Sequence, residues 1–474
     1  MNKDEIARHF NTIAPKYDEW KKRNSYYYDC LKNFFRENTQ ETDNVVDIGC
    51  GTGSILAAVR GKHKLGVDIS ENMIRIARNK FPEIEFRVHD CETPLAEKHT
   101  FDVAILADVA DHCADLLNLL ENANLFLRKG GRLCITTMNP AWEPLYKLAE
   151  LFKMKMPEGE HSFLPNQVLA GFLPLRGFRT IETSARFLIP KRIPLLSDKV
   201  NRIAARFNAF HCICAVQTLV AEKVNHYERD FSSPLSCSVI VPCLNEQDNI
   251  EQCVSRIPEI GNKTEVIIVD DGSTDETLRI AEQAASSDRR IKVISYGTNK
   301  GKGYAVRKGF DAAGCDIVMI LDADMTVPPE ELPIFFRAIA EGCGEFANGT
   351  RMIYPPEKQA MRLLNKIGNF FFGIVLSWLL SQRISDTLCG TKALRRADYG
   401  RIHMGNDKWG DFDLLFGAAE NGLHIVEVPV HYKSRKAGES KMKPFSHCLL
   451  LLGVCFNWFL RSKLRRRHTA TAIK

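Results

Sequence analysis

The sequence predicts an α/β protein with two doubly wound domains, followed by a C-terminal apolar or amphipathic helix. Three observations support this fold class. The 474 residues exceed what one hydrophobic core holds, short apolar runs alternate with helical segments in both halves, and several of these runs end in carboxylates. Open α/β sheets bind ligands at the carboxyl ends of their strands. We therefore expect one ligand site in each half.

Composition excludes several classes of protein. The chain is 45% hydrophobic and 26% charged, as globular proteins are. Its net charge of +6 is matched by six basic residues in 461–474, so the remainder is balanced and nucleic-acid binding is not expected. The N-terminus lacks the apolar run of a signal peptide. The 15 cysteines form no C-x-x-C pair, which favours reduced, buried thiols in a cytoplasmic protein over disulfides or zinc.

Changes in character along the chain predict its domain boundaries. Residues 1–223 alternate strands and helices. Residues 224–236 are polar, include Ser-Ser-Pro, and are typical of a linker. A second α/β domain is expected over 237–445, with an apolar helix and a basic tail over 446–474.

The first domain opens with a strand that leads into a glycine-rich turn, in the run 45–54 (VVDIGCGTGS). Glycines there let the backbone approach a ligand closely. A second strand at 65–69 ends in Asp68, where an acid can bind ribose hydroxyls. Asp90 follows a third strand at 86–88, a fourth strand lies at 101–106, and a fifth follows the glycine turn in 128–135.

These motifs resemble the class I S-adenosylmethionine-dependent methyltransferases over residues 8–222, and the segment 10–20 is similar to the cap of the ubiquinone-biosynthesis type. The resemblance implies that Asp68 binds the ribose of S-adenosylmethionine and Asp90 the adenine, with Asp108 near the methyl acceptor. It assigns the amino acid part of the cofactor to Asp47, Gly49, Gly51 and Gly53.

Two other interpretations of the glycine turn are weaker. Dinucleotide folds favour G-x-G-x-x-G, whereas the glycines here run G-x-G-x-G. A purely structural turn would not account for the acids that follow the next two strands. The methyl acceptor cannot be identified, because Asn139-Pro140 is only part of the motif that amino-methylating enzymes carry.

The second domain places polar residues after each strand. Pro242, Asn245 and Glu246 follow the strand at 238–241 and are placed to meet a base or ribose. Asp270 and Asp271 end the strand at 266–269. The run 299–305 (NKGKGYA), which contains Lys302, opens a helix and suits phosphate contacts.

The strand at 318–321 is followed by Asp322 and Asp324. Two carboxylates two residues apart suit a hard divalent cation, Mg²⁺ or Mn²⁺, that also holds phosphate oxygens. This layout is typical of an enzyme that handles a nucleotide diphosphate.

The set resembles glycosyltransferase family 2, and especially the dolichyl- and polyprenyl-phosphate sugar synthases, over 237–445. The resemblance implies a GT-A sheet, a nucleotide-sugar donor and a polyprenyl-phosphate or other lipid-linked acceptor. It assigns phosphate contacts to Arg351, and to Arg435 and Lys441 in the loop 432–441, and places Lys392 on the acceptor side. The run 411–413 is similar to the family's acid-aromatic-Asp element that opens the next helix. As alternatives, Asp411 could simply cap that helix, and the loop cations could be solvated. Thr326 stands where many relatives carry Gln.

The expected chemistry is an inverting displacement at the sugar C1, in which a cation on Asp322 and Asp324 offsets charge on the departing nucleoside diphosphate. A lipid phosphate is already anionic and needs no strong base. A sugar hydroxyl, as in cell-envelope glycan synthesis, would need one, and Asp413 or Asp386 is the candidate. In that alternative the first domain could be only a cofactor-binding module.

Two apolar stretches, 370–380 and 448–460, are too short to span a bilayer. The first is equally compatible with a core helix and an interfacial one. For the second we favour a membrane interface, because the basic tail follows it directly. The expected location is therefore peripheral, on the cytosolic face of a membrane.

Overall fold

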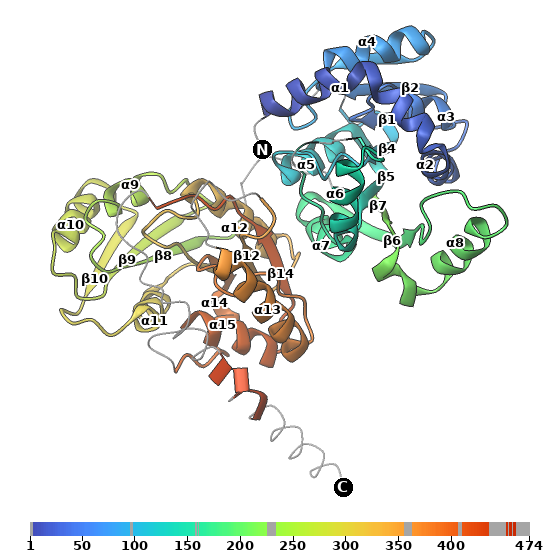
Figure 1. Cartoon of the computed structure of the whole chain (residues 1–474). Helices are drawn as coiled ribbons and strands as arrows, with labels where there is room; N and C mark the ends of the chain where they lie inside the picture. Colours follow the sequence, from blue (N-terminus) through green and yellow to red (C-terminus); the bar gives the residue numbers. More distant parts are fainter. Residues whose placement is uncertain are drawn as a thin grey trace. The chain divides into compact units, whose positions relative to one another are not determined.

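The computed structural model describes residues 3–94, 98–156, 159, 161–224, 234–354, 363–405, 410–435, 452–453, 455–456 and 458–460. Contacts divide the chain into two compact units, Met1–Arg229 and Asp230–Lys474. Figure 1 shows each unit as a twisted sheet flanked by helices. Both units are α/β, as the sequence predicts.

The first unit contains a seven-stranded sheet in the order β3-β2-β1-β4-β5-β7-β6. Its strands are β1 (Asn44–Ile48), β2 (His63–Asp68), β3 (Glu85–Val88), β4 (Phe101–Ala107), β5 (Leu127–Met138), β6 (Phe178–Arg186) and β7 (Val216–Lys223). Pairing is parallel from β3 through β5, whereas β7 is antiparallel to both β5 and β6. The parallel part has its order reversal beside β1, the topological position at which such sheets bind ligands.

Helices surround this sheet and cover its ligand edge. They are α1 (Lys3–Arg23), α2 (Ser25–Glu37), α3 (Ser54–Ala58), α4 (Glu71–Lys80), α5 (Leu116–Phe126), α6 (Glu143–Leu151), α7 (Asn166–Phe172) and α8 (Ser197–Arg206), with 3-10 turns η1 (Pro140–Trp142), η2 (Pro174–Arg176) and η3 (Asn208–Ile213). Asn11 of α1 accepts hydrogen bonds from the Ser70 hydroxyl and the Asn72 backbone. This contact fixes the N-terminal helix over the start of α4.

The second unit contains a mixed seven-stranded sheet in the order β10-β9-β8-β11-β13-β12-β14. Its strands are β8 (Cys237–Cys243), β9 (Thr264–Asp270), β10 (Ile291–Ser295), β11 (Ile317–Ile320), β12 (Phe346–Thr350), β13 (Lys392–Arg395) and β14 (Ile425–Pro429). β8 to β11 pair in parallel, while β13 runs antiparallel to its neighbours β11 and β12. Every residue of β9 is buried, as its apolar run predicts.

The helices of the second unit are α9 (Ile250–Ser255), α10 (Thr277–Ser287), α11 (Lys302–Ala312), α12 (Leu332–Ala340), α13 (Leu363–Leu380), α14 (Arg396–Tyr399) and α15 (Gly410–Glu420), with η4 (Pro329–Glu331) before α12. α11 packs on β8 and β9, and α15 packs on α11. The N-termini of α11 and α15 are thereby brought close together, and Lys302 bonds to Asp411 across them.

The apolar stretch 370–380 lies within α13 and combines both characters that its sequence allows. Phe372 and Leu376 are buried in the core, whereas Phe371, Ile374 and Trp378 are exposed. No helix among the described residues has the length and hydropathy needed to cross a membrane. Most of the predicted segment 446–474, with its basic tail, lies outside the described residues, as do residues 225–233 of the predicted linker.

Candidate functional site

The carboxyl ends of β8, β9 and β11 meet at a cavity of about 290 Å³ in the second unit. Each strand leaves polar residues at this edge because its own apolar residues are buried in the sheet. The cavity is lined by four predicted donor-site residues and both predicted metal ligands: Pro242, Glu246, Asp271, Lys302, Asp322 and Asp324. Segments some eighty residues apart in the sequence therefore line one cavity.

A second cavity of about 220 Å³ adjoins the first. Lys302, Asp322, Asp324 and Arg435 line both cavities. Its other walls include Arg351 and Tyr432, together with the segment 387–390. The arrangement provides two chambers with the two aspartates at their junction, as a reaction between two bound substrates requires.

Basic side chains contact both aspartates at this junction. Lys302 Nζ lies 2.7 Å from Asp322 Oδ1 and 3.3 Å from Asp411 Oδ2. Arg435 Nη2 lies 2.8 Å from Asp324 Oδ2. Burial raises the pKa of Asp322, but the attraction of Lys302 outweighs it and the net pKa is lowered. Asp322 is therefore ionised at neutral pH.

Thr326 supports Asp324 directly. Its backbone N–H and its hydroxyl both donate to Asp324 Oδ1, at 3.1 and 2.9 Å. Thr326 thus orients the carboxylate itself.

The donor set at the junction fits a divalent cation held jointly by protein and phosphate. Among the described residues no group of three or more His, Cys, Asp or Glu side chains is arranged to hold a metal alone. Asp411 Oδ1 is nevertheless buried without a hydrogen-bond partner. One or two carboxylates plus substrate phosphates is the usual environment of Mg²⁺. From the sequence alone, Asp411 belongs to the acid-aromatic-Asp run 411–413, with helix capping as the alternative, and it is not among the predicted site residues.

Gly390 allows the two chambers to meet. A Cβ at this position would overlap Asp322 Oδ2 and lie 2.7 Å from Lys302 Nζ. A side chain at this position would therefore force the carboxylate and the ammonium to move.

Several predicted donor-site residues brace the loops of the site. Asp271 accepts hydrogen bonds from the Tyr296 hydroxyl and from the backbone of Lys300 and Gly301, all within 2.9 Å. These bonds fix the turn before α11. Asp270 accepts from Ser273 and Ser295. Neither Asp270 nor Asn245 lines the cavity.

Asn245 connects two loops at the edge of the sheet. Its side-chain oxygen accepts from the backbone N–H of Thr274 at 2.8 Å, and its own N–H donates to the Ser273 hydroxyl. It adopts a positive φ of 54°. Glu246, in contrast, lines the cavity while accepting from Asn249.

Arg351 and Asp386 form a bidentate pair beside the second cavity. Arg351 Nε and Nη2 donate to the two Asp386 carboxylate oxygens at 2.6 and 2.8 Å. Asp386 is fully buried and does not line either cavity. Burial raises its pKa, but Arg351 outweighs this and the net pKa is lowered. Arg351 does line the cavity, stacked beside the Tyr432 ring.

The remaining predicted residues of this unit are dispersed. Lys392 is buried on β13 and donates to the Cys389 carbonyl. Asp413 accepts from the backbone N–H of Gly405 at 2.8 Å and lines neither cavity. Lys441 lies outside the described residues.

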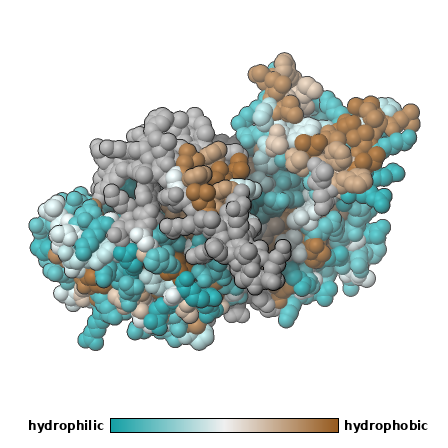
Figure 2. Space-filling view, turned by 90° about the horizontal axis from the view of Figure 1, so that it is seen from below, coloured by the Kyte–Doolittle hydropathy of each residue, from teal (hydrophilic) through white to brown (hydrophobic). Residues whose placement is uncertain are grey.

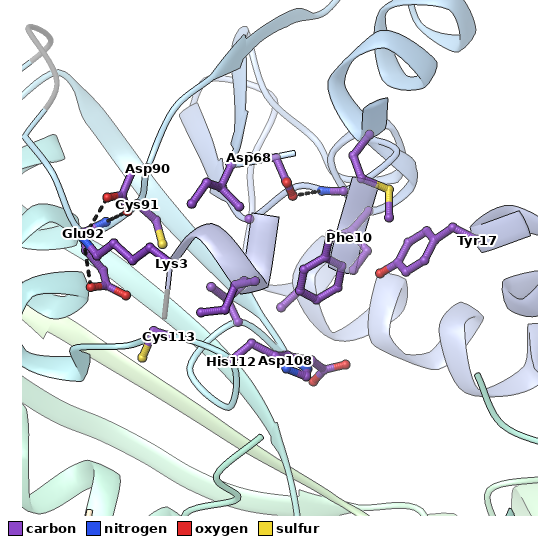
Figure 3. A pocket seen from close by; sticks show the side chains of 18 of the residues that line it. Lys3, Phe10, Tyr17, Asp68, Asp90, Cys91, Glu92, Asp108, His112 and Cys113 are labelled. Atoms are coloured by element: carbon purple, nitrogen blue, oxygen red, sulfur yellow. Dashed lines mark hydrogen bonds and ion pairs between the residues drawn. The ribbon is translucent and has the colours of Figure 1, made fainter. Parts of the chain in front are cut away.

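In the first unit a cavity of about 110 Å³ lies at the carboxyl edge of β1, β2 and β4, under α1. Figure 3 shows Asp68, Asp90 and Asp108 around it, with Phe10 and Tyr17 contributed by the N-terminal helix. Gly49 and Gly51 of the glycine turn also line it. Gly51 adopts a φ of +55°, a left-handed conformation that residues with side chains rarely take, so the turn favours glycine at this position.

The carboxylates of this cavity are held by defined donors. Asp68 accepts from the backbone of Gly51 and Ser70, both at 2.8 Å. Asp90 is paired with Lys3 at 2.7 Å, as the dashed lines in Figure 3 show. Asp108 accepts from the Tyr27 and Thr136 hydroxyls.

Asp47 is different, because both of its carboxylate oxygens are buried without a hydrogen-bond partner. It does not itself line the cavity. Burial raises its pKa to about 7. A buried carboxylate without donors is suited to a ligand ammonium, such as that of the methionyl group in S-adenosylmethionine. Gly53, also outside the lining, packs against the Phe86 ring, which a Cβ would overlap.

Lys21 of α1 lines the same cavity and was not identified from the sequence. Its ammonium lies 4.4 and 5.0 Å from the Tyr17 and Tyr28 ring centroids and 3.3 Å from the Ser54 hydroxyl. Burial lowers its pKa to about 8. A helix lysine is indistinguishable from surface lysines in sequence, so nothing in the pattern could have selected it.

Two family models match the chain. The model described as glycosyl transferase family 2 matches residues 238–402, and a methyltransferase domain model matches residues 20–183. The matched residues contain the junction aspartates in one unit and the glycine turn in the other.

Curated relatives are named as lipid-phosphate sugar transferases. The polyprenol monophosphomannose synthase of Mycolicibacterium smegmatis is 31% identical over 48% of this chain and 88% of its own length. The dolichyl-phosphate hexose transferase of Haloferax volcanii is 31% identical over 44% of this chain and 87% of its own length. The dolichol-phosphate mannosyltransferase of Pyrococcus furiosus is 32% identical, and the chain spans 60% of it.

Solved structures resemble the units at low identity. A glucosyl-3-phosphoglycerate synthase from Mycobacterium tuberculosis is 20% identical with a TM-score of 0.39, over 48% of this chain and 78% of that protein. A methyltransferase from Thermotoga maritima is 18% identical with a TM-score of 0.37, over 46% of this chain and 99% of that protein.

Proposed function

Since the chain belongs to glycosyl transferase family 2 and also contains a methyltransferase domain, we propose that it is a bifunctional transferase. The second unit moves a sugar from a nucleotide-diphospho-sugar to polyprenyl phosphate. The first unit transfers a methyl group from S-adenosylmethionine. The observation that carries the sugar-transfer activity of the second unit is its pair of cavities, which share the lining residues Asp322, Asp324, Lys302 and Arg435.

The first cavity receives the donor, with its nucleoside against Pro242 and Glu246 and its diphosphate near Lys302. A divalent cation bound by Asp322 and Asp324 would offset the charge that grows on the departing diphosphate. Lys302 and Arg435 contribute further positive charge at the same place. The acceptor attacks C1 from the second cavity and inverts the anomer.

The second cavity favours an anionic acceptor. Arg351 and Arg435 line it, and both are suited to bidentate phosphate contacts. Asp386, one of the two candidate bases, is buried and neutralised by Arg351, so we assign it to positioning that arginine. An acceptor phosphate already carries the charge needed for attack, and no base is needed.

The alternative is a sugar hydroxyl acceptor in cell-envelope glycan synthesis. It would require a base, and Asp413 remains the candidate, although it contacts the Gly405 backbone and not the cavity. In this alternative the methyltransferase unit acts only as a cofactor-binding module. The basic lining of the second cavity favours the phosphate acceptor.

For the first unit we propose that Asp68 and Asp90 hold the ribose and adenine of S-adenosylmethionine. Asp47 and Lys21 complement the ammonium and carboxylate of its methionyl part. The opposite charges of these two side chains support this orientation. The methyl acceptor enters beside Asp108, and we place the protein peripherally on a membrane, where a lipid-linked acceptor is available.

The test incubates the full-length protein, Mn²⁺ or Mg²⁺ and polyprenyl phosphate with a panel of radiolabelled nucleotide sugars. We expect label in the lipid fraction from one donor and its loss in Asp324→Ala. Asp316→Ala is the matched control, because Asp316 immediately precedes β11 at the opposite end from the site. Metal-dependent hydrolysis of a donor without lipid labelling would contradict the lipid-phosphate acceptor while keeping the sugar-transfer site.

A further inference from the structure

One face of the methyltransferase unit exposes many apolar side chains. It comprises residues 191–213, which include α8 and η3, and we call it the docking face. Its exposed apolar residues are Ile193, Leu195, Leu196, Ile203, Phe207, Phe210 and Ile213. Figure 2 shows hydrophobic residues gathered in patches on the surface of this unit. Contiguous apolar surface of this kind marks an interaction site.

The helix at the centre of the docking face is oriented opposite to an ordinary surface helix. α8 buries Ser197, Asn201 and Ala204 and exposes Ile203, with Phe207 exposed one turn further on. Hydrogen bonds impose this orientation. Asn201 accepts from the Ile189 backbone at 2.9 Å and donates to the Tyr26 hydroxyl. The helix therefore cannot rotate its apolar residues inward without breaking buried polar contacts.

The loop before α8 presents an apolar tip. Leu195 is 88% exposed and adopts a positive φ of 65°, a conformation that a leucine rarely takes. The loop is anchored behind the tip, where the Ser197 hydroxyl accepts from Ile193 N–H at 2.8 Å and donates to the Lys191 carbonyl at 2.7 Å. The tip is thus held outward by the protein itself.

Charge on the docking face identifies the partner. Five of its basic residues are exposed: Lys191, Arg192, Lys199, Arg202 and Arg206. Its only acid is Asp198, which accepts from the Tyr26 hydroxyl. Apolar side chains that enter the headgroup boundary, next to cations that attract anionic lipids, are characteristic of interfacial membrane elements. A nucleic acid would also be attracted by these cations, but its binding would not explain why Leu195 is held exposed at the tip of the loop. A lipid surface explains both features.

We propose that residues 191–213 dock the methyltransferase unit on an anionic lipid surface. Leu195 and Leu196 enter the boundary between headgroups and acyl chains, and the basic residues of α8 contact lipid phosphates. This docking would present the methyl-donor site to a lipid-linked acceptor. It is independent of the sugar chosen by the other unit and of the predicted C-terminal helix.

The experiment measures binding of the full-length protein to vesicles of phosphatidylcholine, with and without 30% phosphatidylglycerol (~0.15 M salt). Two variants test the face: Leu195→Ser with Leu196→Ser, and Lys199→Glu with Arg202→Glu. We expect each to weaken binding to anionic vesicles by roughly tenfold. Because these side chains are exposed, folding should be unaffected.

Matched controls lie at the other edge of the same sheet. Val88→Ser removes an exposed apolar residue and Lys62→Glu reverses an exposed charge, and both should bind as the wild type does. Hydrogen exchange gives the second readout, with protection expected over 191–213 on anionic vesicles.

Wild-type binding by the docking-face variants, or protection restricted to residues beyond 446, would overturn the proposal. Protection over 191–213 that rises with protein concentration without vesicles would assign the face to a second copy of the chain and overturn it equally.

Discussion

At the scale of single residues, the two sites differ in how their carboxylates are satisfied. Asp322 and Asp324 are paired with Lys302 and Arg435. Asp47 has no donor, and burial raises its pKa to about 7. A cationic ligand group near Asp47 favours the ionised form, so ligand binding must be coupled to loss of its proton.

This coupling predicts a pH dependence. In the free protein a folded pKa near 7, above the ordinary value, leaves Asp47 mostly protonated at pH 6 and mostly ionised at pH 7.5. S-adenosylmethionine affinity should therefore rise roughly eightfold over this interval, in proportion to the ionised fraction of Asp47. Lys21, whose pKa is about 8, stays charged throughout most of it. Burial also raises the pKa of Asp68, against the effect of its backbone donors, so Asp68 is the second group to be tested.

Isothermal titration calorimetry of wild type and Asp47→Asn measures the effect. The variant should bind more weakly and lose most of the pH dependence between 6 and 7.5. An unchanged pH slope in Asp47→Asn would show that another group is titrating.

At the scale of elements, the sugar-transfer site depends on close approach between segments. Gly390, in the segment before β13, faces the Asp322 carboxylate and the Lys302 ammonium. Gly410, at the start of α15, faces Gly303 of α11, and a Cβ there would lie 2.6 Å from the Gly303 Cα. Two glycine contacts thus set how near α15 and β13 come to the aspartates.

We expect Gly390→Ala to reduce sugar transfer by roughly 100-fold, because the methyl group displaces Asp322 and Lys302 from their places. Initial rates and thermal unfolding should be measured together. Gly314→Ala is the control, since a Cβ there meets only Glu265, at 3.7 Å. Full activity in Gly390→Ala would contradict the role assigned to Asp322.

Comparison of sequence and structure shows where pattern reasoning succeeds. The strands that carry Asp68, Asp271 and Asp322 were predicted because buried parallel strands are continuously apolar and their ligand edge is fixed by topology. Both α/β folds followed from the same signal.

The unpredicted features depend on tertiary contacts that leave no local pattern. The sequence around Asp386 would be the same whether its carboxylate faced a substrate or a buried arginine. Only the structure shows that it pairs with Arg351. Lys21 and Gly390 acquire their roles from segments distant in sequence. The outward apolar side of α8 was missed because its helical spacing is compatible with either orientation.

At the scale of the whole molecule, two units each contain a sheet and a cavity of their own. The cavity of the first unit shares no lining residue with the two cavities of the second unit. A substitution of a carboxylate in one site is therefore expected to leave ligand binding and activity at the other site unchanged.

This independence can be checked by a reciprocal pair of variants. Asp324→Ala should abolish sugar transfer and leave the Kd for S-adenosylmethionine within about twofold of wild type. Asp68→Ala should weaken S-adenosylmethionine binding by at least roughly tenfold and leave the sugar-transfer rate unchanged. Loss of both activities in either variant would show coupling between the units.

The cations at the junction have a further consequence for the order of binding. Asp322, Asp324 and Asp411 are balanced there by Lys302, Arg435 and the nearby Lys392. Each of these three carboxylates therefore has a cationic side chain nearby, and a divalent ion that arrives alone must displace cationic groups already in place. A metal–nucleotide complex brings compensating negative charge, and the displaced cationic groups can then hold its phosphates. The metal and the nucleotide-sugar donor should therefore bind together, as one complex. Uptake of the metal by the protein would then depend on the presence of the sugar nucleotide.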